Sequence, residues 1–359
     1  MKNKKIRNFL KKIFGLSIIS FYLIFGISKN QNFNDLKTNL NPILFSPQTE
    51  HNLKKVIIDC INSAKSSIFL RIYHINDKDI ESSLIKKAQE NVPINIICHD
   101  ISKKSSLFQK SQQNPLIHIE PKKIPGSRKL MHIKALTIDD KLTLIGSANL
   151  TKQSLTLDKN LIIGFYNKTF CKSIINNIPC NITQNNQEIS LKINPKQSQE
   201  NLSEIKNLIL NAKKTIKIGM YVFSLPQLID VLEIAHNKGV SVEVIINNTH
   251  AYLTKKLIEK KNITFPIFVK TSPNCLHHKF AWIDDKILIF GSANWTHYGF
   301  YYNDEYILYL YNLTLEQQQK MNKIWIELNL CKRPLIDRQE ENNIIYLFRW
   351  IEKLFQKVA

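Results

Sequence analysis

Apolar residues follow the same order of helical and strand-like spacing in two long stretches of the chain. In the first stretch, an amphipathic helix precedes an apolar strand at 68–75, and a second helix precedes a strand at 93–98. The second stretch repeats this order, with its strands at 216–223 and 240–246. The apolar positions that define the four helices are Leu53, Ile57, Cys60 and Ile61; Ile80, Leu84, Ile85 and Ala88; Leu202, Ile205, Leu208 and Ile209; and Leu228, Leu232 and Ala235. Strands that alternate with helices predict α/β layers around a buried, largely parallel sheet.

The two stretches are copies of one another. Residues 46–75 align without gaps on residues 194–223. The matched positions include Pro47 with Pro195, Ala64 with Ala212 and Tyr73 with Tyr221. Similarity over this length indicates a duplicated domain rather than a copied loop. We therefore expect a first domain over 40–168, a linker over 169–193 and a second domain over 194–330.

A second repeated block, at 131–151 and 276–296, carries polar side chains in a fixed spacing. Each copy has a His, a Lys two positions later, an Asp five positions after the Lys, and then Gly-Ser-Ala-Asn. The matched residues are His132, Lys134, Asp139 and Asn149 in the first copy, and His277, Lys279, Asp284 and Asn294 in the second. One copy of this pattern would be weak evidence, because His and Lys are common at strand ends. Two copies with the same downstream segment predict one two-fold active site.

The block predicts a loop, a strand, a turn and a second strand. Alternation with period two places His132 and Lys134 on one face of the first strand. The second strand ends at Ser147 (Ser292 in the other copy), where a glycine before it lets the backbone approach a ligand, and Asn149 projects near the same edge. An imidazole, an ammonium and an amide at one edge can hold a phosphoryl group against a nucleophile.

The two aspartates of the block allow two interpretations. Asp139 and Asp284 follow the first strand of each copy and begin the turn. Their carboxylates could stabilise the turn backbone or act directly in the site, and the sequence does not separate these roles.

These residues resemble the phospholipase D superfamily, whose signature is H-x-K-x-x-x-x-D followed by a Gly-Ser-x-Asn segment. The resemblance covers nearly all of the chain after residue 40. It implies two α/β/α sandwich domains related by pseudo-two-fold symmetry, with the active site at their interface. It also implies that His132 attacks phosphorus to form a phosphohistidine, while His277 protonates the leaving oxygen and then activates water. Lys134, Lys279, Asn149 and Asn294 would hold the non-bridging oxygens. An imidazole that attacks inside a cationic site needs no metal and no cofactor.

One position departs from the family pattern, which places a carboxylate after the Asn to orient each histidine. In the second copy Glu305 supplies it, but the equivalent position of the first copy is Asn160, with Asp158 two residues before it. Three alternatives stay open: Asp158 substitutes, His132 works with an amide partner, or the first half-site is weakened. On this spacing we expect Asn160 to keep His132 neutral for attack and Glu305 to keep His277 protonated as the acid.

The charge of the chain suits an anionic substrate. The formal net charge is +21, but only six of the 50 basic residues are Arg, so much of it is lysine spread over solvated faces. A local cluster, Lys122, Lys123, Arg128 and Lys129, lies just before His132.

The leading interpretation is a phospholipase D-type hydrolase or transphosphatidylase acting on phospholipids. The alternatives are a metal-independent nuclease of the same superfamily and a non-catalytic effector that binds lipid or nucleic acid. No obligate protein partner is indicated, and association with a membrane surface is possible.

The two ends of the chain predict export and a terminal helix. Basic residues precede an uncharged apolar run, so residues 1–28 have the order of a secretory signal or a membrane anchor. The protein is therefore expected to be secreted or membrane-anchored. Residues 335–358 predict an amphipathic helix that could dock on a membrane surface. Such an apolar stripe more often packs on a neighbouring domain, and we expect this one to pack on the second domain. Among the six cysteines, Cys171 and Cys180 are the pair most suited to a disulfide.

Overall fold

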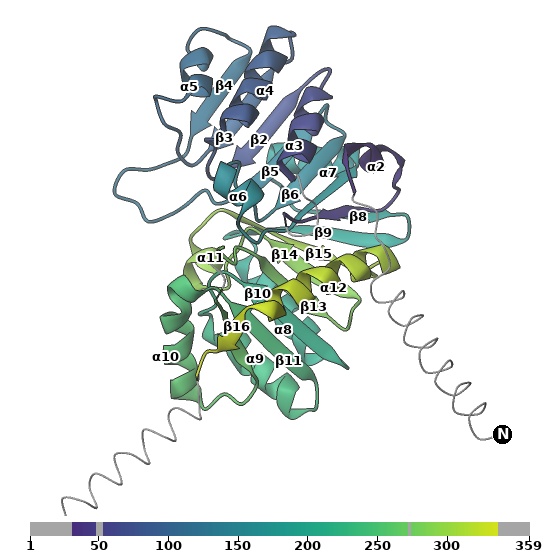
Figure 1. The fold of residues 1–359 in the computed structure, drawn as a ribbon, viewed down its shortest axis with the longest axis vertical. Coiled ribbons are helices and arrows are strands. Elements are labelled where there is room, and N and C mark those ends of the chain that lie inside the picture. The colour runs from purple at the N-terminus through teal and green to yellow at the C-terminus, as the bar shows by residue number, and fades with distance from the viewer. Residues whose placement is uncertain (1–30, 48–52, 272–273, 337–359) are drawn as a thin grey trace, which may run out of the picture.

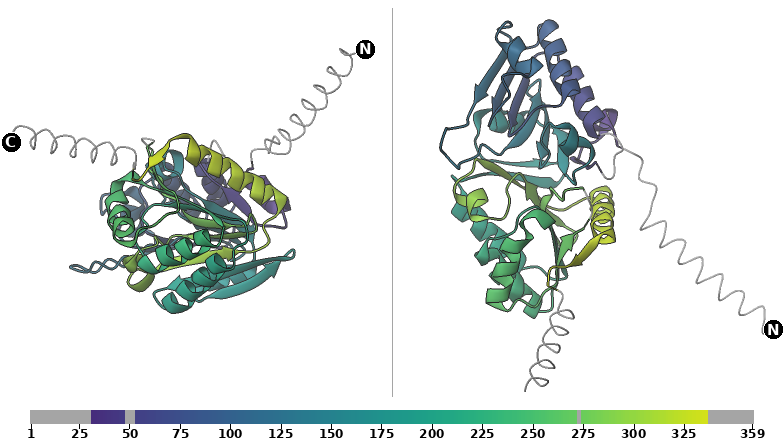
Figure 2. Two further views of the ribbon diagram at one scale, coloured as in Figure 1. Left: turned by 90° about the horizontal axis from the view of Figure 1, so that it is seen from below. Right: turned by 60° about the vertical axis from the view of Figure 1, so that its left-hand side comes forward.

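The computed structural model describes residues 31–47, 53–271 and 274–336. Within these residues the chain forms two α/β domains, each built on one mixed sheet (Figure 1). The first domain, coloured purple to teal, lies against the second, coloured green to yellow, in all views (Figure 2). The predicted architecture of two similar α/β domains is confirmed.

The described part of the first domain has a seven-stranded sheet in the order β1-β7-β6-β5-β2-β3-β4. Its strands are β1 (Ile43–Phe45), β2 (Ile68–Ile72), β3 (Ile94–Cys98), β4 (Ile117–Pro121), β5 (Lys134–Ile138), β6 (Leu142–Gly146) and β7 (Ile162–Tyr166). Its helices are α2 (Phe33–Thr38), α3 (Leu53–Asn62), α4 (Lys78–Gln89), α5 (Ser106–Ser111), α6 (Lys152–Thr156) and α7 (Lys168–Asn176). The predicted helices and the strands at 68–75 and 93–98 appear as α3, α4, β2 and β3, with β2 ending earlier than expected.

The second domain repeats this order in a sheet of nine described strands, β16-β12-β11-β10-β13-β14-β15-β9-β8. Its strands are β8 (Cys180–Gln184), β9 (Gln187–Asn194), β10 (Thr215–Met220), β11 (Ser241–Ile246), β12 (Ile267–Lys270), β13 (Lys279–Ile283), β14 (Ile287–Gly291), β15 (Glu305–Leu310) and β16 (Lys332–Pro334). Its helices are α8 (Ser198–Leu210), α9 (Pro226–Asn237), η1 (Asn248–His250), α10 (Ala251–Lys261), α11 (His297–Tyr301) and α12 (Leu315–Leu330).

The expectation of a largely parallel sheet is wrong. Parallel pairing is confined to β2-β3-β4 in the first sheet and β10-β11-β12 in the second. The motif strands pair antiparallel, β5 with β2 and β6 and β13 with β10 and β14. The reason is the tight turn that each motif block contains: Asp139, Asp140, Asp284 and Asp285 have φ between 51° and 58°, so each turn reverses the chain into a hairpin.

Two apolar cores stabilise the individual domains, and a third joins them. The first sheet buries one face under α3 and α4, and the second buries the equivalent face under α8 and α9. A third core joins the opposite faces of the two sheets, and it includes Phe165 and Phe170 from the first domain with Trp282 and Tyr306 from the second. The domains therefore share a continuous buried interface, which fixes the positions of residues that lie on either side of it.

The segment expected to link the domains, 169–193, forms most of α7 together with β8 and nearly all of β9. The expected disulfide within it is wrong, because Cys171 and Cys180 are both free thiols. Cys171 is buried in α7, where its sulfur lies 3.0 Å from the hydroxyl of Thr143. Packing of α7 on the first sheet has placed this side chain toward the core.

Two predictions fall outside the described residues: the signal or anchor at 1–28, and nearly all of the terminal helix at 335–358. Across the ranges that the structure does describe, none of the helices combines the length and the apolar character needed to cross a bilayer.

Candidate active site

The two motif histidines precede the first residue of equivalent strands. His132 lies two residues before Lys134, where β5 begins, and His277 lies two residues before Lys279, where β13 begins. Both strands are central in their sheets and are buried along their whole length. Because the strands are buried, each His–Lys pair has a fixed position at the interface between the two domains.

Short backbone pairings between the domains lock both histidines. The His132 N–H donates to the Asp304 carbonyl at 2.9 Å, and the Asp304 N–H donates to the Leu130 carbonyl at 2.8 Å. The equivalent pairing joins the His277 N–H to the Lys159 carbonyl at 2.9 Å, and the Lys159 N–H donates to Cys275 at 2.8 Å. These two parallel bridges are related by the internal duplication, so each domain completes the half-site of the other.

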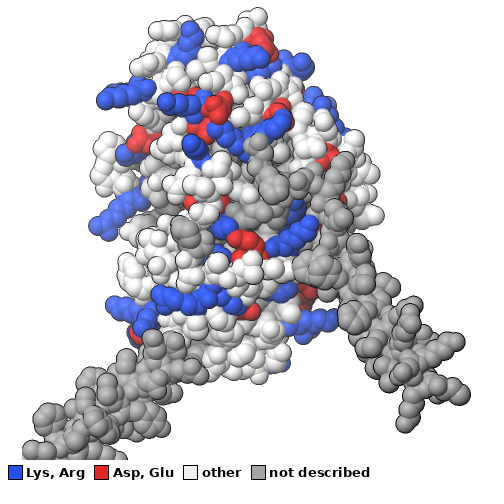
Figure 3. All heavy atoms as spheres, in the orientation of Figure 1, with Lys and Arg blue, Asp and Glu red and all other residues white. Residues whose placement is uncertain are grey.

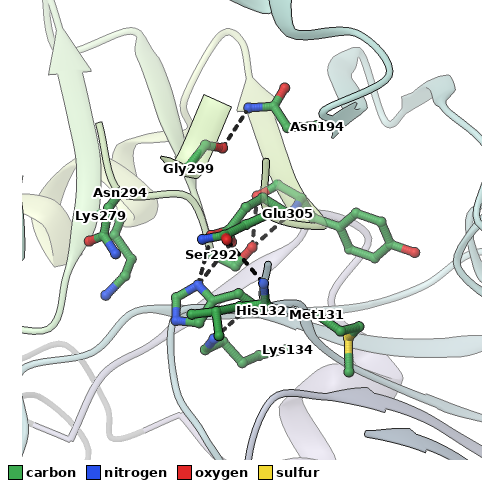
Figure 4. A network of polar contacts seen from close by, with 12 residues as sticks. Met131, His132, Lys134, Asn194, Lys279, Ser292, Asn294, Gly299 and Glu305 are labelled. Atoms are coloured by element: carbon green, nitrogen blue, oxygen red, sulfur yellow. Dashed lines mark hydrogen bonds and ion pairs between the residues drawn. The ribbon is translucent and has the colours of Figure 1, made fainter. Parts of the chain in front are cut away.

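The bridges bring the partner of each histidine from the opposite domain. Glu305 accepts from His132 Nδ1 at 2.8 and 3.0 Å, as Figure 4 shows. Asn160 Oδ1 lies 2.9 Å from His277 Nδ1. The expectation that Asn160 serves His132 and that Glu305 serves His277 is therefore wrong. Residues close in sequence to one histidine reach across the interface to the other.

Asp158 does not replace Asn160 as the group on His277 Nδ1. Its carboxylate accepts from the side chain of Gln153 at 3.1 Å and from the backbone of Cys275. The equivalent residue of the second domain is Asn303, whose side chain accepts from the Leu130 N–H at 3.1 Å. The acid and the amide have thus exchanged positions between the two halves.

The two lysines are held in the same way in both halves. Lys134 Nζ donates to the His132 carbonyl at 2.5 Å, and Lys279 Nζ donates to the His277 carbonyl at 2.7 Å. Each ammonium also lies over a tyrosine ring, Tyr73 at 4.9 Å and Tyr221 at 4.8 Å. A cation above an aromatic face is attracted by the ring quadrupole, which helps to retain these ammonium groups in a buried site.

Tyr73 and Tyr221 also contact the histidines. The ring of Tyr73 lies edge-on to His132 at 4.9 Å, and the ring of Tyr221 lies 5.1 Å from His277. We did not predict these tyrosines as site residues, although the alignment of Tyr73 with Tyr221 was the signal that could have found them. The repeat preserves an aromatic ring at the place where it contacts both members of each His–Lys pair.

The serines and asparagines after each motif strand support the histidine partners. Ser147 donates to Asn160 Oδ1 at 2.8 Å, and Ser292 is hydrogen-bonded to Glu305. Asn294 lies beside Lys279 (Figure 4) and accepts the Val222 N–H at 3.3 Å. The carbonyl oxygen of Asn149 is buried and has no hydrogen-bond partner among the residues that the structure describes.

Asp139 and Asp284 lie at the far ends of the motif strands and do not join the site. Asp139 accepts from the backbone of Lys65, Ser66 and Ser67 at 2.7 to 3.2 Å. Asp284 accepts from the backbone of three equivalent residues, Lys213, Lys214 and Thr215, at 2.7 to 2.9 Å. Of the two interpretations left open, the structure shows the turn-stabilising one.

Burial and neighbouring cations set the protonation of the site. Burial lowers the pKa of His132 and of His277 well below the usual value, and Lys134 and Lys279 act in the same direction on both rings. Burial also lowers the pKa of Lys279 to about 7, lowers that of Lys134 strongly, and raises that of Glu305 to about 8. Each histidine feels the lysine of the opposite domain, so the two half-sites form one electrostatic unit.

The site chemistry is therefore that of imidazoles and cations. Each histidine binds its partner through Nδ1, which leaves Nε2 for a reacting group. No group of three or more His, Cys, Asp or Glu side chains arranged to hold a metal ion occurs in the ranges 31–47, 53–271 and 274–336.

Comparison with known proteins identifies the architecture. The family described as "Cardiolipin synthase, PLD-like domain" matches residues 57–179 and 205–325, one match in each domain. A mitochondrial cardiolipin hydrolase of Mus musculus is 29% identical over 140 residues, which are 38% of this chain and 62% of that protein. A phospholipase D of Rickettsia bellii (strain RML369-C) is 30% identical over 125 residues, 34% of this chain and 59% of that protein. The chain thus spans less than two thirds of these relatives' own length.

A solved structure extends the likeness to the whole fold. The phosphatidylserine synthase of Haemophilus influenzae Rd KW20 superimposes with a TM-score of 0.67, covering 90% of this chain and 98% of that protein at 14% sequence identity. At this identity the likeness concerns the fold. The family match in both domains, over most of the chain, shows that the chain belongs to the phospholipase D superfamily.

Proposed function

We propose that the protein is a phospholipase D-type phosphodiesterase that cleaves the headgroup phosphodiester of phospholipids through a phosphohistidine on His132. The observation that carries this proposal is the crossed pairing of the two motif histidines. Both rings are held at Nδ1 by the opposite domain, beside two buried lysines that belong to the same repeated motif. This arrangement supplies a nucleophile, an acid and a cationic site for one phosphodiester.

The carboxylate partner supports His132 as the nucleophile. The Nδ1–H of His132 donates to Glu305, so Nε2 carries the free lone pair. This lone pair attacks phosphorus, and the bond from phosphorus to the leaving oxygen breaks. Attack places positive charge on the imidazole. Burial raises the pKa of Glu305, but the positive charge that forms on the ring 2.8 Å away favours its carboxylate, which in turn stabilises that charge. The sequence spacing had suggested that His132 attacks because Asn160 keeps it neutral. In the structure the carboxylate of Glu305 lies beside His132 instead.

The amide partner supports His277 as the acid. Burial and the two lysines favour a neutral His277 in the empty site, and the negative charge of a bound phosphodiester favours its protonated form. Protonated His277 gives its Nε2 proton to the leaving oxygen, and the neutral ring then accepts a proton from water. The resulting hydroxide attacks phosphorus, and the bond from phosphorus to His132 breaks. An amide stabilises imidazolium less than a carboxylate does, so Asn160 makes His277 a stronger acid.

The lysines support an anionic substrate. Burial lowers the pKa of Lys279 to about 7, and an anion bound beside it favours the charged form. Substrate binding therefore completes the charge of the site, where Lys134 and Lys279 stabilise the negative oxygens of the transition state. As the family pattern implies, the side-chain NH2 groups of Asn149 and Asn294 would donate to these oxygens, and Asn294 lies beside Lys279.

The relatives favour a lipid over other phosphodiesters. Those matched in sequence are named as a cardiolipin hydrolase and a phospholipase D, and the structural neighbour as a phosphatidylserine synthase. We therefore propose a phospholipid as the substrate.

We also propose that residues 1–28 direct export or anchoring, which the basic-then-apolar order of that segment supports. Comparing the mass of the protein before and after secretion tests this second proposal.

A direct assay tests the function. Purified protein is incubated separately with phosphatidylcholine, cardiolipin and single-stranded DNA, and released headgroup, phosphatidate and nucleotides are quantified. We expect phosphatidate from at least one phospholipid and none after His132→Ala or His277→Ala. Cleavage of DNA alone would replace the lipid with nucleic acid, and cleavage of neither by a protein that hydrolyses nitrophenyl diesters would refute both substrates.

A further inference from the structure

We propose that the protein docks on an anionic lipid bilayer through a face beside the active site, formed by the loop 122–130 and by Leu157, Tyr298 and Tyr302. We call these residues the docking face. This inference rests on the proposed lipid substrate, and it adds the surface by which the enzyme reaches that substrate.

The loop is basic and carries an exposed apolar tip. It contains Lys122, Lys123, Arg128 and Lys129 and has no acidic residue. Ile124 is 60% exposed in its middle. Figure 1 shows the connection from β4 to β5 projecting from the body on the left, level with the junction of the domains, and Figure 2 shows it projecting in two further views. Lys and Arg side chains stand out along that edge in Figure 3.

The base of the loop is fixed beside the catalytic residues. Leu130 pairs with the backbone of Asp304, and Lys129 forms an ion pair with the Asp304 carboxylate at 2.9 Å. Asp304 is the neighbour of Glu305, the partner of His132. A bilayer that contacts the loop is therefore close to the reacting groups, because the base of the loop is bound to the residue next to Glu305.

Exposed apolar side chains continue the face on both domains. Tyr302 is 49% exposed and Leu157 is 53% exposed, and they occupy equivalent positions three residues before Glu305 and Asn160. Three residues span at most about 10 Å. Tyr298, 42% exposed, lies against Tyr302 with ring centroids 5.2 Å apart. The duplication thus places an apolar side chain on each side of the site.

The chemistry of this face fits a membrane better than a nucleic acid. Lysine side chains are attracted to an anionic bilayer, each strengthening binding by about fivefold. Exposed aliphatic residues and tyrosines enter the interfacial region of a bilayer. Single-strand binders instead combine basic grooves with stacking aromatics and Arg, and three of the four loop cations are Lys. A nucleic acid would leave the exposed Ile124 and Leu157 without a function.

Three of the loop cations have acidic neighbours, which weakens but does not cancel the attraction. Lys123 pairs with Asp100 at 2.7 Å, Lys122 pairs with Glu120, and Lys129 pairs with Asp304. The first two pairs are exposed, where ion pairs contribute little and exchange readily with other anions. Lys122, Lys123 and Arg128 are thus the cations to change, since Lys129 contacts the segment that carries Glu305.

The experiment uses the full chain and a tryptophan reporter. Ile124→Trp places the probe on the docking face, and Leu315→Trp places a matched probe at the start of α12, where the side chain is 76% exposed. Emission is measured as the difference from the parent protein. On vesicles that contain phosphatidylglycerol, we expect a blue shift for Ile124→Trp but none for Leu315→Trp. Phosphatidylcholine vesicles should give a smaller shift. No shift of Ile124→Trp on anionic vesicles, or a shift only with single-stranded DNA, overturns the proposal.

Kinetics separate docking from catalysis. Ile124→Asp, and a triple change of Lys122, Lys123 and Arg128 to Gln, should each lower hydrolysis of anionic vesicles by roughly tenfold or more. Both variants should hydrolyse a soluble nitrophenyl diester at the unchanged rate. Equal rates on vesicles would overturn the docking face. If the emission of Ile124→Trp shifts on vesicles but the parent enzyme cleaves only the soluble diester, the docking surface stands and the lipid substrate fails.

Discussion

His132 rests on a carboxylate and His277 rests on an amide, although the two histidines occupy equivalent places in a duplicated motif. Almost everything else around them is matched: a lysine bound to the motif backbone, a tyrosine under that lysine, and a backbone bridge from the opposite domain. The scaffold is therefore symmetric while its proton chemistry is not. One exchanged position can give two equivalent rings different roles.

The direction of the asymmetry follows from charge. A nucleophilic imidazole gains positive charge when it attacks phosphorus, so a buried carboxylate beneath it lowers the barrier. An acidic imidazole must lose positive charge, so an amide beneath it makes the proton easier to release. Glu305 and Asn160 satisfy these opposite needs only because the domains exchange partners across their interface.

The largest expected effect is the loss of the carboxylate. Glu305→Gln keeps the size of the side chain but removes the charge that stabilises His132 during attack, so kcat should fall by on the order of 10² to 10⁴. The measurement is kcat on a soluble diester at saturating concentration. A loss of less than threefold would show that the two halves do not differ in the way we describe.

The reverse change should shift the pH profile. Asn160→Asp puts a carboxylate beside His277, which favours the protonated ring and raises its pKa. Because the acid form of His277 is required, the rate falls as pH rises through that pKa, so the alkaline limb of kcat should move up by roughly one unit. At a pH on that limb the variant should be several-fold faster than the parent. An unmoved limb, or one that moves to lower pH, would assign the acid role to another group.

A matched pair of aspartates separates stability from catalysis. Asp139→Ala and Asp284→Ala each leave three backbone N–H groups without their acceptor, those of residues 65–67 and 213–215 respectively, which should cost about 1–3 kcal/mol. The measurement is the urea midpoint, with kcat of the folded protein unchanged. A variant that folds normally but loses activity would show that these aspartates act directly in the active site.

The effect of Asp139 should also depend on pH. Burial alone would raise the pKa of Asp139, but hydrogen bonds from the backbone of Ser66, Lys65 and Ser67 outweigh it and lower the pKa. A carboxyl whose pKa is lowered on folding stabilises the protein above its unfolded pKa, near 4. The difference between parent and Asp139→Ala should therefore shrink as pH falls below about 4.

The last expected effect concerns the tyrosines. Tyr73→Leu removes the ring beneath Lys134 and against His132, and kcat/KM should fall by about 3- to 30-fold, as expected for a lost cation–π contact. Tyr73→Phe keeps the ring and should retain activity. Tyr221→Leu and Tyr221→Phe are the matched pair in the other half. If the Phe variants lose as much as the Leu variants, the hydroxyl rather than the ring acts.

The repeated spacing was enough to predict two similar α/β halves, with the histidines and lysines at equivalent places in them. Lys134 and Lys279 begin buried strands in equivalent positions, and a polar pattern that recurs with identical downstream residues is specific for a two-fold site. The turn between the motif strands was predicted as well, and Asp139 and Asp140 accept the positive φ that reverses the chain there. Applying that turn to the sheet would have corrected the expectation of parallel strands.

The histidine partners were beyond such reasoning. Glu305 is 28 residues after His277 in the sequence, yet it binds His132 because the third core packs the two sheets face to face. Distance along the chain favoured the wrong pairing, and only the domain interface decides which side chain reaches which ring. The tyrosines were missed for a related reason: an aromatic residue at a strand end is usually core.

The most direct test of the account is the position of the phosphoryl group in a trapped intermediate. A ³²P-labelled nitrophenyl diester, whose leaving group needs no proton, is mixed with His277→Ala, and the labelled enzyme is quenched in alkali and mapped by mass spectrometry. We predict a phosphohistidine at His132, formed in His277→Ala and absent from His132→Ala. Label on His277, formed by His132→Ala, would contradict the assignment of roles by Glu305 and Asn160.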